Sequence, residues 1–112
     1  MPVDKPRVMI AIEDKDAMAS IAGVLWFKGY EVYKSNSAEE CMSKINELKD
    51  RNMHVVIVSQ QVALDDRAML IVKVKRTNID TKVLAIADED NEKTKILDYG
   101  ADEFTLKPIS PE

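Results

Sequence analysis

The chain has 112 residues, of which 46% are hydrophobic, 16 are basic and 20 are acidic, which gives a net charge of −4. These values are typical of one globular domain with a packed core and argue against a disordered chain. The basic residues are scattered among the acidic ones, so no basic stripe exists to neutralise the phosphates of a nucleic acid. The single cysteine, Cys41, excludes an internal disulfide and favours a reducing, cytoplasmic setting. No apolar run approaches the roughly 20 residues that span a bilayer, so we expect no membrane insertion.

The first half of the chain alternates strand-like and helix-like segments. Residues 7–12 form an unbroken apolar run, which indicates a strand buried on both faces. Residues 16–28 have apolar side chains at helical spacing, with Asp16 as the predicted cap and Gly29 as the predicted end of this helix. The alternating stretch 30–34 suits an edge strand, and Ser37 and Glu40 form a capping box that opens a helix to about residue 49. The Val- and Ile-rich run 55–58 predicts the central strand, because β-branched residues fit a pleated strand.

The second half continues the alternation. A polar loop at 59–64 precedes a helix that we expect over about 65–76, and the apolar run 82–87 predicts a fourth strand. Asp90 or Asn91 caps a fourth helix through Tyr99, which Gly100 ends, and residues 101–107 carry a fifth strand. Strands that alternate with helices predict an α/β fold: a doubly wound parallel sheet with right-handed crossovers and helices on both faces.

Four segments, in their order and spacing, resemble the receiver domains of two-component response regulators. They are residues 9–14 (Met-Ile-Ala-Ile-Glu-Asp), residues 25–32, the strand that ends at Ser59, and residues 100–108 (Gly-Ala-Asp-Glu-Phe-Thr-Leu-Lys-Pro). The resemblance extends over nearly the whole chain, so residues 1–112 are interpreted as one receiver-like domain. It implies a flavodoxin-like fold with five parallel strands in the order 2-1-3-4-5.

The resemblance also assigns roles to site residues, and the chain departs from the family at two of them. Receivers accept a phosphoryl group on an Asp at the end of the third strand, where this chain has Ser59. A Thr or Ser after the fourth strand binds that group, and Ala87 stands there. Four other features match: an acidic pair for Mg²⁺, a residue whose backbone carbonyl is a further ligand, a lysine before proline and an aromatic switch residue, here Glu13 with Asp14, Gln61, Lys107 and Phe104.

These departures predict a degenerate pseudo-receiver that is neither an enzyme nor a phosphoryl acceptor. A Ser hydroxyl is a weak nucleophile without an adjacent base, and the only histidine, His54, begins the same strand at its opposite end. Losing the Asp also removes an anionic ligand, so we expect no cofactor and only weak Mg²⁺ binding, if any, by Glu13, Asp14 and Gln61. Lys107 then pairs with an acidic neighbour such as Asp14.

Two functions remain open. The first is a phosphorylation-independent signalling module that binds proteins through the face formed by helix 4, strand 5 and helix 5. The second is a switch with other chemistry, in which a Ser/Thr kinase phosphorylates Ser59 or a small ligand binds near Lys107. A flavin or nucleotide enzyme is disfavoured, because the loop after the first strand is acidic and no Gly-rich loop occurs.

The end of the sequence gives a separate expectation about the fold. Receivers have a fifth helix after the fifth strand, packed beside the first helix, whereas this sequence stops at Ser110-Pro111-Glu112, a pattern typical of a helix start. We therefore expect the fifth helix to be missing or truncated and parts of strands one, three and five to be exposed. Either the residues are a fragment of a longer protein or a second copy covers this face in a homodimer.

Overall fold

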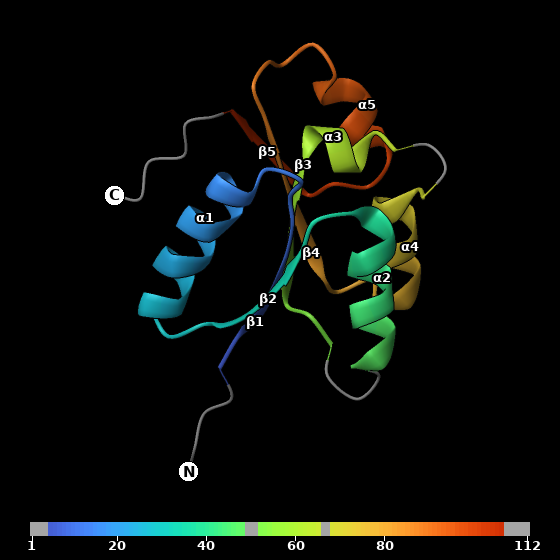
Figure 1. The fold of residues 1–112 in the computed structure, drawn as a ribbon. Helices are drawn as coiled ribbons and strands as arrows, with labels where there is room; N and C mark the ends of the chain where they lie inside the picture. Colours follow the sequence, from blue (N-terminus) through green and yellow to red (C-terminus); the bar gives the residue numbers. More distant parts are fainter. Residues whose placement is uncertain (1–4, 49–51, 66–67, 107–112) are drawn as a thin grey trace.

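The computed structural model describes residues 5–48, 52–65 and 68–106. Its five strands form one parallel sheet in the order β2-β1-β3-β4-β5, which confirms the predicted flavodoxin-like topology (Figure 1). The strands are β1 (Arg7–Ala11), β2 (Glu31–Ser35), β3 (Val55–Ser59), β4 (Lys82–Ala87) and β5 (Glu103–Leu106). The Val- and Ile-rich strand β3 is central, and β2 is an edge strand, as predicted.

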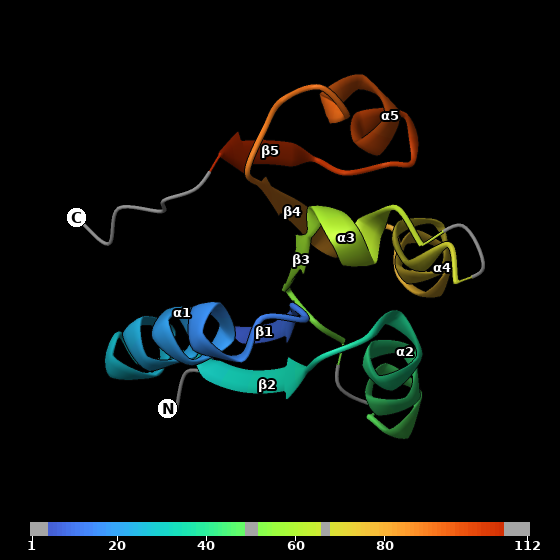
Figure 2. The same cartoon turned by 45° about the horizontal axis from the view of Figure 1, so that its top comes forward.

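Helices cover both faces of this sheet. They are α1 (Lys15–Phe27), α2 (Ala38–Glu47), α3 (Gln60–Ala63), α4 (Leu70–Thr77) and α5 (Lys93–Asp98). Helix α1 lies on one face, and α2, α4 and α5 lie on the other (Figure 2). Within the described ranges, no helix is both long and apolar enough to cross a bilayer.

The core has two layers, one on each face of the sheet. Val56 and Val58 of β3 belong to the layer under α2, α4 and α5, whereas Ile57 belongs to the layer under α1. Both sides of β3 are therefore buried, which explains why its sequence is an unbroken apolar run. Cys41 is fully buried in the first layer, and burial raises the pKa of its thiol to about 11, as expected for a core residue.

Three predicted element ends are confirmed by the backbone. Gly29 after α1 has φ +95° and Gly100 after α5 has φ +117°, the left-handed conformation that ends a helix at little cost for glycine. The Ser37 hydroxyl accepts the N–H of Glu40 at 3.1 Å, and the Glu40 carboxylate accepts the N–H of Asn36 at 2.7 Å. The predicted capping box therefore forms, except that the Glu40 carboxylate binds the N–H of Asn36 and not that of the N-cap residue Ser37.

The helix starts are where the predictions were wrong. Asp14, not Asp16, caps α1, and its Oδ1 accepts the N–H groups of Asp16 at 2.9 Å and Ala17 at 3.2 Å. The predicted loop at 59–64 contains the single helical turn α3, and the helix expected from residue 65 begins only at Leu70. Met69 precedes it with φ 49°, so the chain turns sharply before α4 can start. The helix expected from Asp90 or Asn91 begins at Lys93.

The sheet face beside α1 is less exposed than we expected. Val8 and Ile10 of β1 and Ile12 just after it point to this face, and all three are buried because α1 packs across them. The prediction that parts of strand one are exposed was therefore wrong. Val55 of β3 and Leu84 of β4 are half-buried on the same face. The segment 107–112, with the predicted helix start, lies outside the described residues.

Candidate functional site

The neighbouring parallel strands β1, β3 and β4 have their carboxyl ends side by side at one end of the sheet (Figure 1). This carboxyl-terminal edge is the usual place for ligands in open α/β folds. A hollow of about 270 Å³ lies at this edge. It brings together four of the predicted site residues, Glu13, Ser59, Gln61 and Ala87. This hollow is the candidate functional site.

Ser59 is held in place by two hydrogen bonds. Its hydroxyl donates to Oε1 of Glu13 at 2.5 Å, a length typical of a hydroxyl bound to a carboxylate, and it accepts the N–H of Val62 at 3.2 Å. The second bond makes Ser59 the N-cap of α3. Only 2% of Ser59 is exposed, so its hydroxyl is both buried and engaged.

The acidic pair after β1 is divided between two tasks. Glu13, which is half-buried, points its carboxylate at Ser59, whereas Asp14 is exposed and uses Oδ1 to cap α1. Asp14 is not among the residues that line the hollow. In the described part of the chain, no group of three His, Cys, Asp or Glu side chains is placed to hold a metal ion. Weak or absent Mg²⁺ binding by Glu13, Asp14 and Gln61 therefore stays a prediction, since Mg²⁺ can be held by one or two carboxylates together with water.

The remaining lining residues change the chemistry of the hollow. Ala87 is buried and offers only a methyl group where a hydroxyl would be needed to bind an oxyanion. Asp88 follows it and adds a second acidic side chain to the lining, beside Gln60 and Leu64. Sequence reasoning missed Asp88, although its position directly after a buried parallel strand was a usable signal.

The other predicted positions are not among the described residues that line this hollow. Phe104 on β5 is half-buried and packs against the core layer under α2, α4 and α5. Lys107 lies outside the described residues, so its pairing with Asp14 stays a prediction. His54 is exposed at the opposite end of β3, where its Nδ1 accepts the N–H of Arg7 at 2.9 Å.

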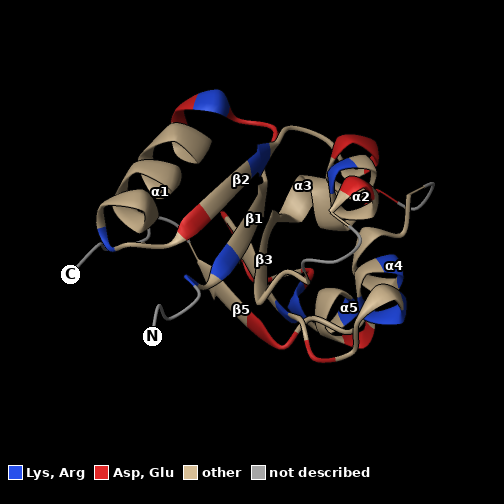
Figure 3. Ribbon diagram, turned by 90° about the horizontal axis from the view of Figure 1, so that it is seen from below, with Lys and Arg blue, Asp and Glu red and all other residues tan. Residues whose placement is uncertain are grey.

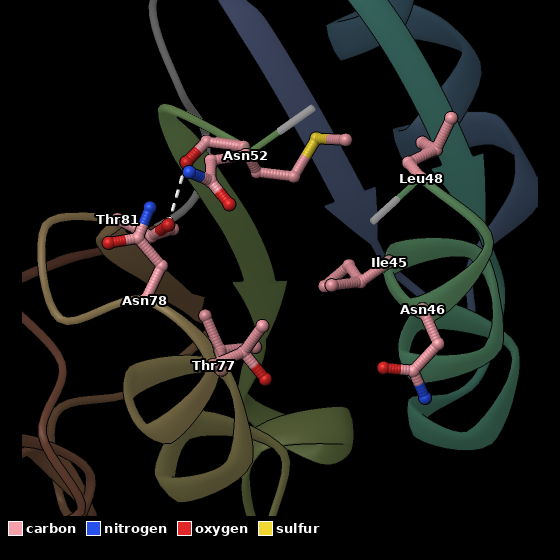
Figure 4. A pocket seen from close by; sticks show the side chains of 9 residues that line it. Ile45, Asn46, Leu48, Asn52, Thr77, Asn78 and Thr81 are labelled. Atoms are coloured by element: carbon pink, nitrogen blue, oxygen red, sulfur yellow. Dashed lines mark hydrogen bonds between the residues drawn. The ribbon is translucent and has the colours of Figure 1, made fainter. Parts of the chain in front are cut away.

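A second hollow, of about 170 Å³, lies at the opposite edge of the sheet between α2 and α4 (Figure 4). Thr81 donates its hydroxyl to the carbonyl of Met53 at 2.6 Å on one side of it. None of its described lining residues is ionisable; they are Ile45, Asn46, Leu48, Asn52, Met53, Val74, Thr77, Asn78 and Thr81. It therefore lacks the acid, base or charged groups that most chemistry requires.

Comparisons with known proteins agree with this geometry. No protein-family model matches the chain. The chain is 27% identical over 117 aligned positions to the transcriptional regulatory protein PrrA of Mycobacterium leprae, covering 96% of this chain and 46% of PrrA. The chain thus spans about half the length of this curated relative.

Solved structures resemble the whole fold. A CheY-like response regulator receiver domain protein of Methanospirillum hungatei has a TM-score of 0.82 at 23% identity, with 96% of this chain and 86% of that one covered. Chemotaxis protein CheY4 of Vibrio cholerae has a TM-score of 0.82 at 18% identity, with 96% and 91% covered. A response regulator of Thermotoga maritima has a TM-score of 0.79 at 20% identity, with 97% and 90% covered. The chain therefore has the flavodoxin-like fold of response-regulator receiver domains.

Proposed function

We propose that the chain is a receiver-type signalling module that acts by binding other proteins and does not accept a phosphoryl group. The observation that carries this proposal is the hydrogen bond between Ser59 and Glu13. In this arrangement the hydroxyl at the acceptor position stabilises two neighbouring elements, the loop after β1 and the turn α3. The resemblance to receivers supports the signalling role, and the chemistry of the site supports the loss of phosphorylation.

Two features of the hollow disfavour phosphoryl transfer. The Ser59 hydroxyl donates a hydrogen bond to the Glu13 carboxylate, but a serine hydroxyl is no substitute for an ionised carboxylate nucleophile. A phosphoryl group at this edge would also face Glu13 and Asp88, with only the Ala87 methyl group where receivers place a hydroxyl. Like charges repel, so these two carboxylates disfavour a phosphoryl group at this position.

The alternative in which a Ser/Thr kinase modifies Ser59 is less well supported. A kinase must bind several residues around its target in an extended form, whereas Ser59 is 2% exposed and ends a central strand. Phosphorylation there would require β3 and α3 to separate. A ligand held near Lys107 would involve residues outside the described ranges.

The proposed contact surface lies over α5 and β5, which correspond to helix four and strand five of a receiver. Leu97 on α5 is 36% exposed and Leu106 on β5 is 43% exposed. On α5, Nζ of Lys95 lies 5.9 Å from the ring centre of Tyr99. Exposed apolar side chains together with an aromatic residue are typical of protein–protein interfaces.

The test is incubation with acetyl phosphate and Mg²⁺, followed by intact-mass measurement. A receiver that retains the acceptor Asp, treated in parallel, is the positive control. We expect this chain to keep its mass while the control gains one phosphoryl group. A stable single phosphorylation of this chain, mapped to the residues around Ser59, would contradict the proposal.

A further inference from the structure

Helix α1 has an outer surface unlike that of an ordinary amphipathic helix. After Lys15 and Asp16 no charged residue occurs before Lys28, and Figure 3 shows the helix uncharged between its two ends. A surface helix normally carries polar and charged side chains on its solvent face, and a helix that is apolar on all sides is normally buried. The outer face of α1 therefore has the composition of a covered surface.

Two large side chains and a groove mark this outer face. Trp26 is 73% exposed and Phe27 is 87% exposed. Beside Trp26, a shallow groove of about 370 Å³ runs between α1 and β2. It is lined by small residues of α1, by Trp26 and by two residues of β2: Ala19, Ala22, Gly23, Trp26, Val32 and Lys34. The space over Gly23 is open, since an added Cβ there meets no heavy atom within 4 Å.

We propose that this face of α1 is a homodimer interface, in which the α1 helices of two copies pack antiparallel about a two-fold axis near Ala22 and Gly23. Residues 19, 22, 23 and 26 follow the i, i+3, i+4, i+7 spacing, so they share one face of the helix. An axis between residues 22 and 23 places Trp26 of one copy opposite the partner's Ala19. Each Trp26 ring then enters the groove above the partner's small residues.

The self-complementarity of this face favours a second copy over a different protein. A two-fold interface must present a projection and a matching recess on the same surface. Here the projection, Trp26, and the recess over Ala19 and Gly23 lie on one stripe of one helix. The interface is on the side of α1 that faces β2, since Val32 and Lys34 line the same groove, and it does not depend on the proposed function.

One charged side chain lies beside the groove. Lys34 beside the groove is placed to approach the partner's Trp26 ring, a favourable cation–π contact.

The test is sedimentation velocity on the full chain, over concentrations up to the millimolar range, with tryptophan emission measured in parallel. We expect the mass to rise from 12.6 kDa toward twice that value. Trp26 is the only tryptophan, so its emission reports on the proposed interface directly and moves to shorter wavelength as dimers form. A chain that stays monomeric, or a dimer whose tryptophan emission does not change, would overturn the proposal.

Two variants and a control locate the interface. Gly23→Glu adds bulk and charge where the groove is open, and Glu forms helices better than Gly, so we expect a folded monomer with the dimer lost. Trp26→Ala removes the projection and should weaken dimerisation at least about tenfold, as for a buried aromatic at an interface. Ser43→Glu adds the same charge to the exposed side of α2 and should leave dimerisation unchanged.

Each result of these variants decides the proposal. If Gly23→Glu dimerises like the wild type, or if Ser43→Glu disrupts the dimer equally, the α1 interface is wrong. If Gly23→Glu fails to fold, Trp26→Ala decides alone, because a side chain that is 73% exposed contributes little to the monomer.

Discussion

The hydroxyl of Ser59 and the carboxylate of Glu13 are joined by a hydrogen bond of 2.5 Å that connects the end of β3 to the loop after β1. These are the positions at which a receiver holds its acceptor carboxylate and one of its metal ligands. A hydroxyl and a carboxylate attract each other directly, whereas two carboxylates repel unless a cation lies between them. A serine at this position therefore needs no cation between its side chain and Glu13 to make this contact.

The first prediction follows from replacing that serine. Ser59→Asp should destabilise the chain in the absence of metal, because two carboxylates then face each other, and it should strengthen Mg²⁺ binding. Thermal melting with and without Mg²⁺ and calorimetric titration measure both effects. Ser59→Ala is the control: it loses the hydrogen bond, at a cost of about 1–3 kcal/mol, but should gain no affinity for Mg²⁺.

Tight Mg²⁺ binding by the wild type, with NMR shifts at Glu13 and Asp14, would contradict this account. We do not expect Ser59→Asp to restore a phosphorylation switch, because Ala87 still lacks the hydroxyl that would bind the new group.

The second prediction concerns the central strand. Val56 is 1% exposed and Ile57 is 7% exposed, on opposite faces of β3. Val56→Asp or Ile57→Asp places an isolated carboxylate in the core without a partner, and we expect either variant to fail to fold. Circular dichroism and thermal melting show the result, with Ser43→Asp on the exposed side of α2 as the folded control. A soluble Val56→Asp variant that melts cooperatively would show that the strand is not central.

The strands could be predicted from the sequence because their burial determines their composition. A strand covered on both faces is apolar along its buried length, and β1, β3 and β4 show this in the unbroken apolar runs 8–11, 55–58 and 83–87. Once the order of strands and helices is known, the crossover rule makes their carboxyl ends meet at one edge. The meeting of Glu13, Ser59 and Ala87 was predictable for this reason.

The parts that could not be predicted depend on single backbone conformations. The turn α3 has only four residues, too few for a helical period to appear. Met69 takes a left-handed conformation that no sequence pattern announces for a residue other than Gly, Asn or Asp, so the start of α4 was placed too early. Which oxygen of Glu13 binds Ser59, and that Asp88 joins the same hollow, follows only from coordinates.

The third prediction tests the corrected start of α1. Asp14 and Asp16 are both acidic and close to the helix start, but only Asp14 accepts hydrogen bonds from the first turn. Asp14→Ala should lower the free energy of unfolding by about 1 kcal/mol, as for other N-cap losses. Asp16→Ala is the matched control and should cost less, since it removes only a favourable charge at the amino end of the helix. Urea unfolding of both variants measures the difference, and an equal or larger loss for Asp16→Ala would mean that the cap is misassigned.

The last prediction concerns Asp102, which ties β5 to the rest of the fold. Its Oδ2 accepts hydrogen bonds from Nζ of Lys75 at 2.6 Å and from the N–H of Val83 at 2.8 Å. The same Lys75 also donates a hydrogen bond to the carbonyl of Thr81 at 2.7 Å. Desolvation by burial acts to raise the pKa of Asp102, but the hydrogen bonds from Lys75 and Val83 outweigh it, so the pKa lies below the ordinary value of 3.8.

A carboxyl group whose pKa is lower in the folded chain than in the unfolded one contributes stability above its unfolded pKa. That contribution is lost as the pH falls below the unfolded value and through the folded one. We therefore expect Asp102→Asn to lower the free energy of unfolding at neutral pH, and the difference from the wild type to shrink as the pH falls below about 4. Urea unfolding over a pH series measures this difference. Repeating the comparison in a Lys75→Gln background supplies the control, because the main cation is then absent and the pH dependence should be weaker. A difference between the Asp102→Asn variant and the wild type that stays constant down to the acid transition would show that the ionised form of Asp102 is not what stabilises this contact.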